Sequence, residues 1–357
     1  MQLFVTHLDR SRFAPAVWSP TDGERGEQLR SLGIPVFAGA DLQHAAETYR
    51  PDIIHIHRAG WPQPELLRPL RPARRLCADG RVLPRIVETN VFGRHDPSAS
   101  GRLIDATLFV SHFCARRFAQ VHGIRTVPPR YHVLYNPVDT TRIGTLGPTP
   151  AQRDYTRPVI GRLSRPDPGK WSPLALSFLP RLARELPDFR YRIIGGIPEA
   201  EAYVRSHNLG QHVTFLPPVQ EDSELAQFFA SLSVLAHAND TGESFGLAIA
   251  EAMAAGLPVV THPCPDLRDN AQLELVDHNV TGLVAHTADD YAEALLYLLR
   301  NPHEAQRMGE AAQRKAQATY EVALITRQLE QIYDSLLTVP TTTPPADTFA
   351  PQGAAVS

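Results

Sequence analysis

The sequence lacks any long hydrophobic run and any strong excess of charge of one sign. Its 357 residues carry 35 Lys and Arg against 38 Asp and Glu, a net charge of −3. No stretch approaches the ~18 consecutive apolar residues of a membrane-spanning helix, and the N-terminus shows no signal-peptide pattern. The charge balance argues against a nucleic-acid partner, because nucleic-acid-binding proteins carry a basic surface. We expect a cytoplasmic protein and leave peripheral contact with the inner face of a membrane open.

Cysteine and lysine are both scarce. The three cysteines, Cys77, Cys114 and Cys264, are far apart and fit neither a zinc-site spacing nor a disulfide framework. We predict reduced thiols, as in a cytosolic protein, and no metal site. Lysine occurs only at Lys170 and Lys315. A lysine inside a suggestive motif is therefore more informative here than in most sequences.

What the sequence does contain is a regular alternation of short β-branched runs with helical patterns, which is typical of parallel α/β architecture. The length suits two domains. The predicted strands of the first series are Ala14–Trp18, Pro35–Phe37, Ile53–His57, Arg85–Glu88, Thr107–Val110 and His132–Tyr135. Those of the second series are Pro158–Arg162, Tyr191–Ile194, Val213–Leu216, Val234–His237, Pro258–Thr261 and Gly282–Ala285. These two series predict two doubly wound domains with a cleft between them, and ligands of such sheets bind beyond the carboxyl ends of the strands.

The domain limits are predicted from the places where this alternation stops. We place a first domain at 1–145, a linker at 146–157, a second domain at 158–318, a C-terminal helix at 319–337 and a tail at 338–357. The helix is expected to pack back toward the first domain. The tail is rich in Pro and Thr and almost uncharged, which predicts disorder.

Two glutamates, Glu243 and Glu251, stand eight positions apart in a segment almost free of other charges, "NDTGESFGLAIAEAMAAGLPVV". We expect a helix that starts at Ser244 or Glu243 and ends at Gly256, which is followed by Pro258. An elongated ligand lying along this helix could touch both carboxylates. A helix-capping Glu243 and a solvent-exposed Glu251 would explain the same residues equally well.

The predicted start of that helix also offers free backbone amides. The N–H groups of Phe245, Gly246 and Leu247 carry a partial positive charge and favour an anion such as a phosphate. A second candidate is "VIGRLSRPDPGKW", where a strand leads into a loop, so that Arg162 and Lys170 could converge on a diphosphate. The alternative for this segment is a solvated basic loop.

Two further segments are weaker signals. "IIGGIPEAE" is a strand that runs into a Gly-Gly turn, as nucleotide-contacting turns do, but one glycine pair is little evidence. In "PDIIHIHRAGW" His55 and His57 share one face of a strand. His55 is expected to pack under a helix, whereas His57, nearer the carboxyl end, could reach a ligand. A structural role is the more common reason for either histidine.

Taken in order, the segments of the second half resemble the retaining glycosyltransferases of family four, which have the GT-B fold. "GESFGLAIAEAMAAGLPVV" is similar to the E-x7-E motif of that family, and "IGRLSRPDPGK" to its Arg…Lys loop. "VTFLPPV" and "LELVDHNVTGLV" stand at the expected places, although "PCPDLRDNAQLE" lacks the double glycine usual before Glu274. In the first half "PDIIHIH", "LFVSHFCARRF" and "YNPVD" resemble family segments more loosely. The likeness reaches to about Leu337 and is strongest over Pro158–Ala285.

The resemblance implies a role for each matching residue. Arg162 and Lys170 would hold the donor diphosphate. Glu243 would meet hydroxyls of the donor sugar, and Glu251 the ribose of the nucleotide. The remaining residues of the implied donor site are Gly161, Gly196, Ser244, Phe245, Gly246 and Leu247.

The implied activity is transfer of a sugar from a UDP- or GDP-sugar to an acceptor hydroxyl, with retention, by front-face attack and without a metal or a permanently bound cofactor. The acceptor would be a saccharide, a lipid-linked sugar or a small molecule, and the oligomeric state is left open. The rival hypotheses are a non-catalytic nucleotide-sugar-binding protein and an epimerase or phosphorylase of the same fold. For a phosphorylase, Lys315 in a late polar helix is a poor candidate for binding pyridoxal phosphate.

Two departures from the family pattern concern the first domain. Asn90 stands where the family usually has a histidine, and His95 follows five residues later, so His57, Asn90 and His95 are the acceptor-side candidates. The first strand and the glycine-rich loop of the family plan have no counterpart before Ala14–Trp18. We therefore expect that strand to be an early one but not the first, with a gap or an exposed strand beside it.

Overall fold

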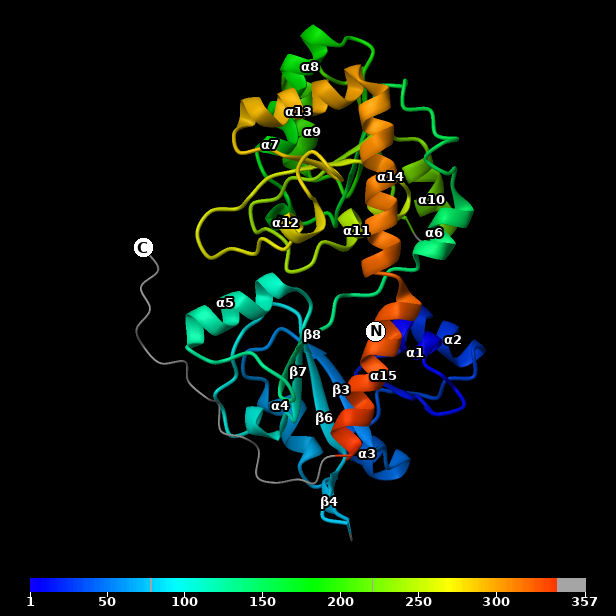
Figure 1. Ribbon diagram of the computed structural model, residues 1–357, viewed down its shortest axis with the longest axis vertical. Coiled ribbons are helices and arrows are strands. Elements are labelled where there is room, and N and C mark those ends of the chain that lie inside the picture. Colours follow the sequence, from blue (N-terminus) through cyan, green and yellow to red (C-terminus); the bar gives the residue numbers. More distant parts are fainter. Residues whose placement is uncertain (78, 220, 339–357) are drawn as a thin grey trace. The chain divides into compact units, whose positions relative to one another are not determined.

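The computed structural model describes residues 1–77, 79–219 and 221–338 (Figure 1). The chain forms two compact α/β units. The first unit comprises Met1–Pro137 and the residues from Val322 onward, and the second comprises Val138–Glu321. Both units are built on parallel sheets, and all twelve predicted strands are present with ends no more than three residues from the predicted ones. Among the described residues, no helix combines the length and the apolar character needed to cross a bilayer.

The second unit contains one parallel sheet of six strands in the order β11-β10-β9-β12-β13-β14. The strands are β9 (Val159–Leu163), β10 (Arg190–Ile194), β11 (Val213–Leu216), β12 (Val234–Ala236), β13 (Val259–Thr261) and β14 (Gly282–Val284). The order runs outward from β9 in both directions, so the neighbouring carboxyl ends of β9 and β12 lie where the winding reverses. Ligands bind at this point in doubly wound sheets.

Helices cover this sheet and supply most of its apolar contacts. They are α6 (Thr140–Leu146), α7 (Leu174–Ser177), α8 (Leu179–Glu185), α9 (Pro198–Ser206), α10 (Asp222–Ala230), α11 (Leu247–Ala254), α12 (Gln272–Leu275), α13 (Ala288–Arg300) and α14 (Pro302–Thr319), with a 3-10 turn at Pro168–Lys170. The core of the unit joins buried side chains of β9, β10 and α13, among them Ile160, Tyr191 and Leu295.

The segment predicted as a linker differs from the prediction. α6, which ends at the first residue of this segment, packs against α10, α11 and α14 of the second unit. Farther along, the buried guanidinium of Arg153 donates to the carbonyl oxygens of Leu232 at 3.1 Å and Ala255 at 2.6 Å. The Tyr155 hydroxyl donates to the carbonyl of Gly256 at 2.6 Å. These anchors place residues 138–157 in the second unit, and the end of the strand–helix alternation in the sequence did not reveal them.

The first unit contains two separate parallel sheets rather than one. Strands β3 (Ile53–Arg58), β6 (Arg85–Asn90), β7 (Ala106–Phe109) and β8 (Tyr131–Val133) form the larger sheet in that order. The strand predicted at Ala14–Trp18 appears as β1 (Val17–Ser19), which pairs with β2 (Val36–Ala38). A short antiparallel pair, β4 (Arg75–Leu76) and β5 (Val82–Leu83), completes the unit. β3 is therefore an edge strand of the four-stranded sheet, and the expectation of a further strand before β1 stays a prediction.

The remaining helices of the first unit include the C-terminal one. They are α1 (Gln2–His7), α2 (Glu24–Ser31), α3 (Leu42–Tyr49), α4 (Pro64–Leu67), α5 (His112–His122) and α15 (Val322–Thr338). Figure 1 shows α15 beside α1, and apolar side chains from both helices, such as Phe4 and Leu329, share one buried cluster with the sheet. The tail predicted to be disordered lies, from residue 339, outside the described residues.

Candidate functional site

The candidate site of the second unit lies at the carboxyl edge of its sheet. β9 carries Arg162 near its end, β12 runs directly into His237 and Asn239, and β13 runs into His262. Because all six strands are parallel, these residues come to the same edge of the sheet. The sequence pattern predicted this edge as the ligand side.

Glu243 is the centre of a polar cluster at this edge. Its Oε1 accepts from Lys170 Nζ at 3.2 Å and from Asn239 Nδ2 at 2.7 Å, and it lies 3.2 Å from His237 Nε2. Its Oε2 accepts from Lys170 Nζ at 3.1 Å. Oε1 thus has three donor groups around it and Oε2 only one within the described part of the chain, which leaves Oε2 the better placed to accept a ligand hydroxyl.

The charge state of Glu243 follows from these neighbours. Burial by itself would raise the pKa of Glu243, but the hydrogen bond and charge of His237 and the charge of Lys170 outweigh it and lower the pKa to about 2. The His237 ring is 8% exposed, and its Nδ1 lies 3.0 Å from the Thr261 hydroxyl. Nε2 donates to the carboxylate, and the Thr261 hydroxyl accepts from Nδ1 when the ring is charged and donates to it when the ring is neutral. Glu243 is therefore an ionised acceptor at any working pH.

Arg162 holds the loops that carry this cluster. It is 2% exposed, its Nη1 donates to the carbonyl of Ala238 at 2.7 Å, and its Nη2 donates to the carbonyl of Lys170. The guanidinium also stacks over the Trp171 ring, 4.3 Å from its centroid. Both terminal nitrogens thus bind backbone on the loops that carry Lys170 and Glu243. This geometry favours a positioning role for Arg162 and differs from the predicted bidentate fork on a diphosphate.

The helix predicted to start at Ser244 or Glu243 starts later. α11 begins at Leu247, with Gly246 in a left-handed conformation (φ 104°) as its N-cap. That backbone angle cannot continue a helix toward Glu243, so the two glutamates do not share one helix. Phe245 is buried with its ring 5.4 Å from that of Tyr320, and only its backbone is left to meet a ligand. The first amides of α11, from Leu247 onward, have no partner within the helix.

Glu251 is the fifth of the eight residues of α11, and its surroundings differ from those of Glu243. It is partly buried and accepts no hydrogen bond from the described part of the chain. Burial, together with the negative charge of Asp222, raises the pKa of Glu251 to about 8. A carboxyl group without donors of its own suits hydroxyl groups supplied by a ligand.

The two glycines assigned to the donor site have packing reasons of their own. A Cβ at Gly161 in β9 would lie 2.1 Å from the Leu232 side chain, and one at Gly196 would lie 2.5 Å from the Phe215 ring. Both positions therefore exclude side chains because of their neighbours in the fold. Contact with a ligand is not needed to explain either glycine.

The loop after β13, which lacks the double glycine of the family, is held by side-chain amides instead. Gln272 is fully buried, its Oε1 accepts from the Glu243 N–H at 3.1 Å, and its Nε2 donates to the carbonyl of His262 at 3.0 Å. The Asn270 amide accepts from Cys264 N at 2.7 Å and donates to the Cys264 carbonyl at 2.9 Å. This network fixes the loop against the backbone of Glu243.

Sequence reasoning missed three of the residues around Glu243, namely His237, Asn239 and Gln272. His237 ends the predicted strand Val234–His237, and Asn239 lies two residues beyond it, in "VLAHAND". The rule that ligands lie beyond the carboxyl ends of strands could have singled them out. Gln272 carried no comparable signal, because its contact with Glu243 depends on the path of a long loop.

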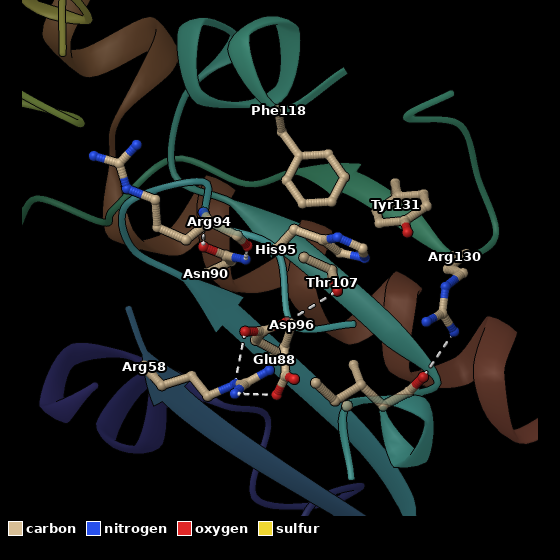
Figure 2. Close-up of a pocket in the computed structure, with 12 residues that line it drawn as sticks. Arg58, Glu88, Asn90, Arg94, His95, Asp96, Thr107, Phe118, Arg130 and Tyr131 are labelled. Atoms are coloured by element: carbon tan, nitrogen blue, oxygen red, sulfur yellow. Dashed lines mark hydrogen bonds and ion pairs between the residues drawn. The ribbon is translucent and has the colours of Figure 1, made fainter. Parts of the chain in front are cut away.

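The acceptor-side candidates of the first unit fall on opposite faces of the sheet. The His57 ring stacks on His55 with centroids 4.7 Å apart and lies beside Phe4 of α1, and burial lowers the pKa of His57 to about 4. Asn90 and His95 instead line a small cavity of about 20 Å³ on the other face, shown in Figure 2. The Asn90 amide is 2% exposed and binds the backbone of Arg94 twice. Asn90 thus holds a loop, and the structure does not bring His57 to it.

Comparisons with known proteins identify relatives of the chain. Residues 151–315 match the family described as "Glycosyl transferases group 1". The chain is 31% identical over 268 residues to the GDP-mannose-dependent alpha-(1-6)-phosphatidylinositol monomannoside mannosyltransferase of Mycobacterium tuberculosis, a match that covers 68% of this chain and 66% of that protein. It is 33% identical over 180 residues to the D-inositol 3-phosphate glycosyltransferase of Mycobacterium sp. strain MCS, covering 45% and 39%. The chain thus spans about two thirds, or less, of these curated relatives.

Solved structures show the same fold. A glycosyltransferase from Rickettsia africae matches with a TM-score of 0.76 at 16% identity, covering 94% of this chain and 93% of that one. Anabaena Alr3699/HepE in complex with UDP matches with a TM-score of 0.72 at 19% identity, covering 94% and 96%. These likenesses confirm the predicted GT-B architecture of two Rossmann-like units.

Proposed function

We propose that this chain, which belongs to the family-four glycosyltransferases of the GT-B fold, transfers a sugar from a nucleotide diphosphate donor to an acceptor hydroxyl with retention. The observation that carries the proposal is the ionised Glu243 at the carboxyl edge of the second sheet. Lys170, His237 and Asn239 surround it. These two groups match the two parts of a sugar diphosphate. The charged carboxylate of Glu243 accepts from the sugar hydroxyls, and the lysine binds the phosphate oxygens.

Lys170 and Glu243 would exchange partners when the donor binds. Sugar hydroxyls donate to Glu243, with Oε2 as the first acceptor, and Lys170 turns to the diphosphate. Lysine suits this exchange because its ammonium is a compact charge on a flexible stem. His237 and Asn239 keep Glu243 ionised and oriented after Lys170 has left. The N-terminal amides of α11 add a second partial positive charge for phosphate, and Glu251 accepts hydroxyls of the nucleoside.

The chemistry then needs no protein nucleophile. The bond between the anomeric carbon and the diphosphate oxygen breaks, and the acceptor oxygen attacks the same face of the sugar. The acceptor proton passes to an oxygen of the departing diphosphate. Lys170 and the start of α11 stabilise the negative charge that develops on that group, the role that fixed donors play in electrostatic catalysis. A divalent ion is not required for this step.

The choice of substrates to test follows from the relatives. One is named for GDP-mannose and a phosphatidylinositol monomannoside, and another for D-inositol 3-phosphate. The structure bound to UDP shows that the same fold also serves a uridine nucleotide. We propose GDP-mannose as the first donor and a phosphorylated inositol as the first acceptor, with UDP-sugars as the comparison set.

The test is nucleotide release from the full chain, measured with donor alone and with donor plus acceptor. We expect slow hydrolysis of one donor, stimulation by an acceptor, and loss of both in Glu243→Gln and Lys170→Ala. Lys315→Ala is the matched control, because the other lysine pairs with Asp277 at 2.8 Å, away from the cluster around Glu243. Donor binding without release in the wild type would favour the non-catalytic binding protein, and a change of sugar configuration without transfer would favour the epimerase.

A further inference from the structure

Two aromatic side chains lie exposed together beyond the carboxyl ends of β3 and β6 in the first unit. Trp61 is 49% exposed and Phe92 is 38% exposed. Their ring centroids are 6.1 Å apart with an angle of 26° between the planes, so they form a stacked pair. Exposed apolar surface that is concentrated at one place, on the ligand side of a parallel sheet, indicates binding rather than packing.

The Trp61 loop is held from below by a buried ion cluster. The Arg58 side chain, 1% exposed, donates from Nη1 to the Trp61 carbonyl at 2.8 Å and pairs with Asp96 at 2.9 Å. Its Nε lies 2.8 Å from Glu88 Oε1 (Figure 2). Charges are costly to bury, and breaking such a pair is strongly destabilising. The cluster therefore fixes the backbone that presents Trp61 and links it to the loop after β6.

The Phe92 loop is held just as firmly. The Asn90 amide donates to the Arg94 carbonyl at 2.7 Å and accepts from the Arg94 N–H at 3.1 Å. Arg117 of α5 donates to the Phe92 carbonyl. Gly60 has φ 100°, and a Cβ there would lie 2.3 Å from the Asn90 side chain and 2.6 Å from the Arg94 carbonyl. The two loops are therefore in direct contact, and the aromatic pair is organised in advance of binding.

Arg94 is an exposed cation two residues after Phe92 in the same loop, and its carbonyl lies against Gly60, the residue before Trp61. Figure 2 shows the Arg94 side chain directed away from the small cavity beneath the loop. Its guanidinium has no hydrogen-bond or ion-pair partner among the described residues, although its backbone is bound at both N–H and carbonyl. Aromatic rings bind the C–H face of a sugar or cyclitol ring, and a guanidinium binds a phosphate with two parallel hydrogen bonds. A phosphorylated sugar or cyclitol offers a partner for each of these two groups.

We propose that Trp61, Phe92 and Arg94 form a subsite for a phosphorylated sugar or cyclitol, the acceptor of the reaction. The rings take the face of the acceptor, and Arg94 takes its phosphate. This inference rests on the proposed function, because it treats the bound molecule as the acceptor. The phosphate can belong to a soluble monoester or to a lipid headgroup. The shared feature is a polyhydroxylated ring that carries a phosphate.

Binding tests the subsite without any turnover. The full chain is titrated with myo-inositol 1-phosphate, myo-inositol and inorganic phosphate, with binding followed by calorimetry and by ligand-observed NMR. We expect myo-inositol 1-phosphate to bind more tightly than either part alone. Trp61→Ala and Phe92→Ala should each weaken it about tenfold, equivalent to ~1.4 kcal/mol. Arg94→Gln should weaken the phosphate ester but leave myo-inositol unchanged, and Arg94→Lys should retain part of the affinity.

Matched controls separate the subsite from general effects of surface truncation. Trp61→Phe keeps an aromatic ring and should keep most of the binding. Tyr297→Ala, at a 40% exposed ring of the second unit, and Val121→Ala, at a 50% exposed position of the first, should change nothing. Each variant is also checked by its thermal unfolding midpoint. Unchanged binding of myo-inositol 1-phosphate in Trp61→Ala, Phe92→Ala and Arg94→Gln would overturn the proposal.

Kinetics and vesicles distinguish the remaining outcomes. In the transferase assay the subsite variants should raise KM for the acceptor while donor hydrolysis without acceptor stays at the wild-type rate. If the wild type does not hydrolyse the donor at all, the proposed function is contradicted. The binding titration would still show whether the subsite exists. Vesicles of phosphatidylinositol and of phosphatidylserine test the lipid source, with phosphatidylinositol expected to bind better. Equal loss of binding to both vesicles in Trp61→Ala, with soluble ligand binding intact, would indicate a membrane contact and overturn the subsite.

Discussion

Lys170 and Glu243 form an ion pair across two loops at the carboxyl edge of the second sheet, with Nζ 3.1 Å from Oε2 and 3.2 Å from Oε1. Neither residue is fixed by this pair alone. Arg162 holds the Lys170 backbone through its carbonyl, and Gln272 holds the Glu243 backbone through its N–H. The two side chains can therefore separate without moving the loops. The proposed donor site requires this, because Lys170 leaves the Glu243 carboxylate and binds the diphosphate.

Removing either partner should cost activity far more than stability. We expect Lys170→Ala and Glu243→Gln each to lower kcat/KM about 10²–10³-fold, the usual effect of deleting one fixed group that stabilises transition-state charge. Lys315→Ala should stay near the wild type. Steady-state nucleotide release measures the effect, and variants that retain full turnover would remove Glu243 and Lys170 from the proposed site.

His237 is expected to act through Glu243. In His237→Ala the carboxylate loses one donor but keeps Lys170 and Asn239. A hydrogen bond to a charged group contributes about 1.5–3 kcal/mol of stability. The pKa of Glu243 should also rise from its low value of about 2, because His237 is the first of the groups that lower it. Activity of the variant should therefore fall off at acidic pH, where the wild type is still active. A His237→Ala profile that parallels the wild type would contradict this role.

Glu251 predicts a pH dependence of nucleotide binding. Burial raises its pKa to about 8 in the free protein, and ribose hydroxyls that donate to it bind the ionised form. Binding then releases a proton, so affinity for the nucleotide should rise with pH, by at most about tenfold per unit below that pKa, and level off above it. Calorimetry of GDP and UDP in buffers of different ionisation enthalpy measures the released proton. Glu251→Gln should bind more weakly and lose the dependence.

Glu251 also predicts how the stability of the ligand-free protein depends on pH. Its contribution to stability should fall as the pH rises, whereas the affinity for nucleotide should rise. The folded-state pKa of Glu251 lies above the ordinary value of 4.5, so the folded protein holds this proton more tightly than the unfolded chain does. This contribution is fully present below pH 4.5 and is lost as the pH rises toward 8. The ligand-free Glu251→Gln variant should therefore gain stability relative to the wild type at alkaline pH. Denaturant midpoints at acidic and alkaline pH give the difference, and equal differences at both would contradict the raised pKa.

The proposed mechanism also predicts independence from divalent ions. Lys170 and the start of α11 supply positive charge where the diphosphate leaves, so a metal is not needed there. Dialysis against EDTA should leave turnover unchanged, and added magnesium should not raise it. Strict dependence on a divalent ion would require a different account of how the leaving group is stabilised.

The sequence predicted the elements of the fold well and the site only in part. Strands such as Val234–Ala236 are continuous apolar runs, so they can be identified from the local sequence alone. Lys170, Glu243 and Glu251 were predicted from a motif. The start of α11 was not, because Gly246 can adopt a backbone angle that the sequence does not specify. The burial of Arg162 depends on carbonyls 76 and 8 residues away along the chain, at Ala238 and Lys170, which no local pattern encodes.

In the first unit two features limited the prediction of site residues. One is which face of the sheet a side chain points to, and the other is the path of the loops. His57 was a candidate for ligand contact from its place near a strand end, with a structural role as the more common reason for such a histidine, and the structure sets it beside Phe4 of α1. Asn90 was predicted as an acceptor-side candidate because it replaces the usual histidine of the family, and in the structure its amide holds the backbone of Arg94. Trp61 and Phe92 drew no attention, because single exposed aromatic residues are common. Their stacking depends on contact between two loops about thirty residues apart in the sequence.

The most direct test of the account is the product formed from an α-configured nucleotide sugar and a phosphorylated inositol. The purified full chain is incubated with GDP-mannose, and in parallel with UDP-sugars, and the anomeric configuration of the product is read by NMR. The account predicts an α-linked product with one of these donors from the wild type and from Lys315→Ala, and none from Glu243→Gln. A β-linked product, or a nucleotide sugar bound tightly with no transfer to any acceptor, would contradict it.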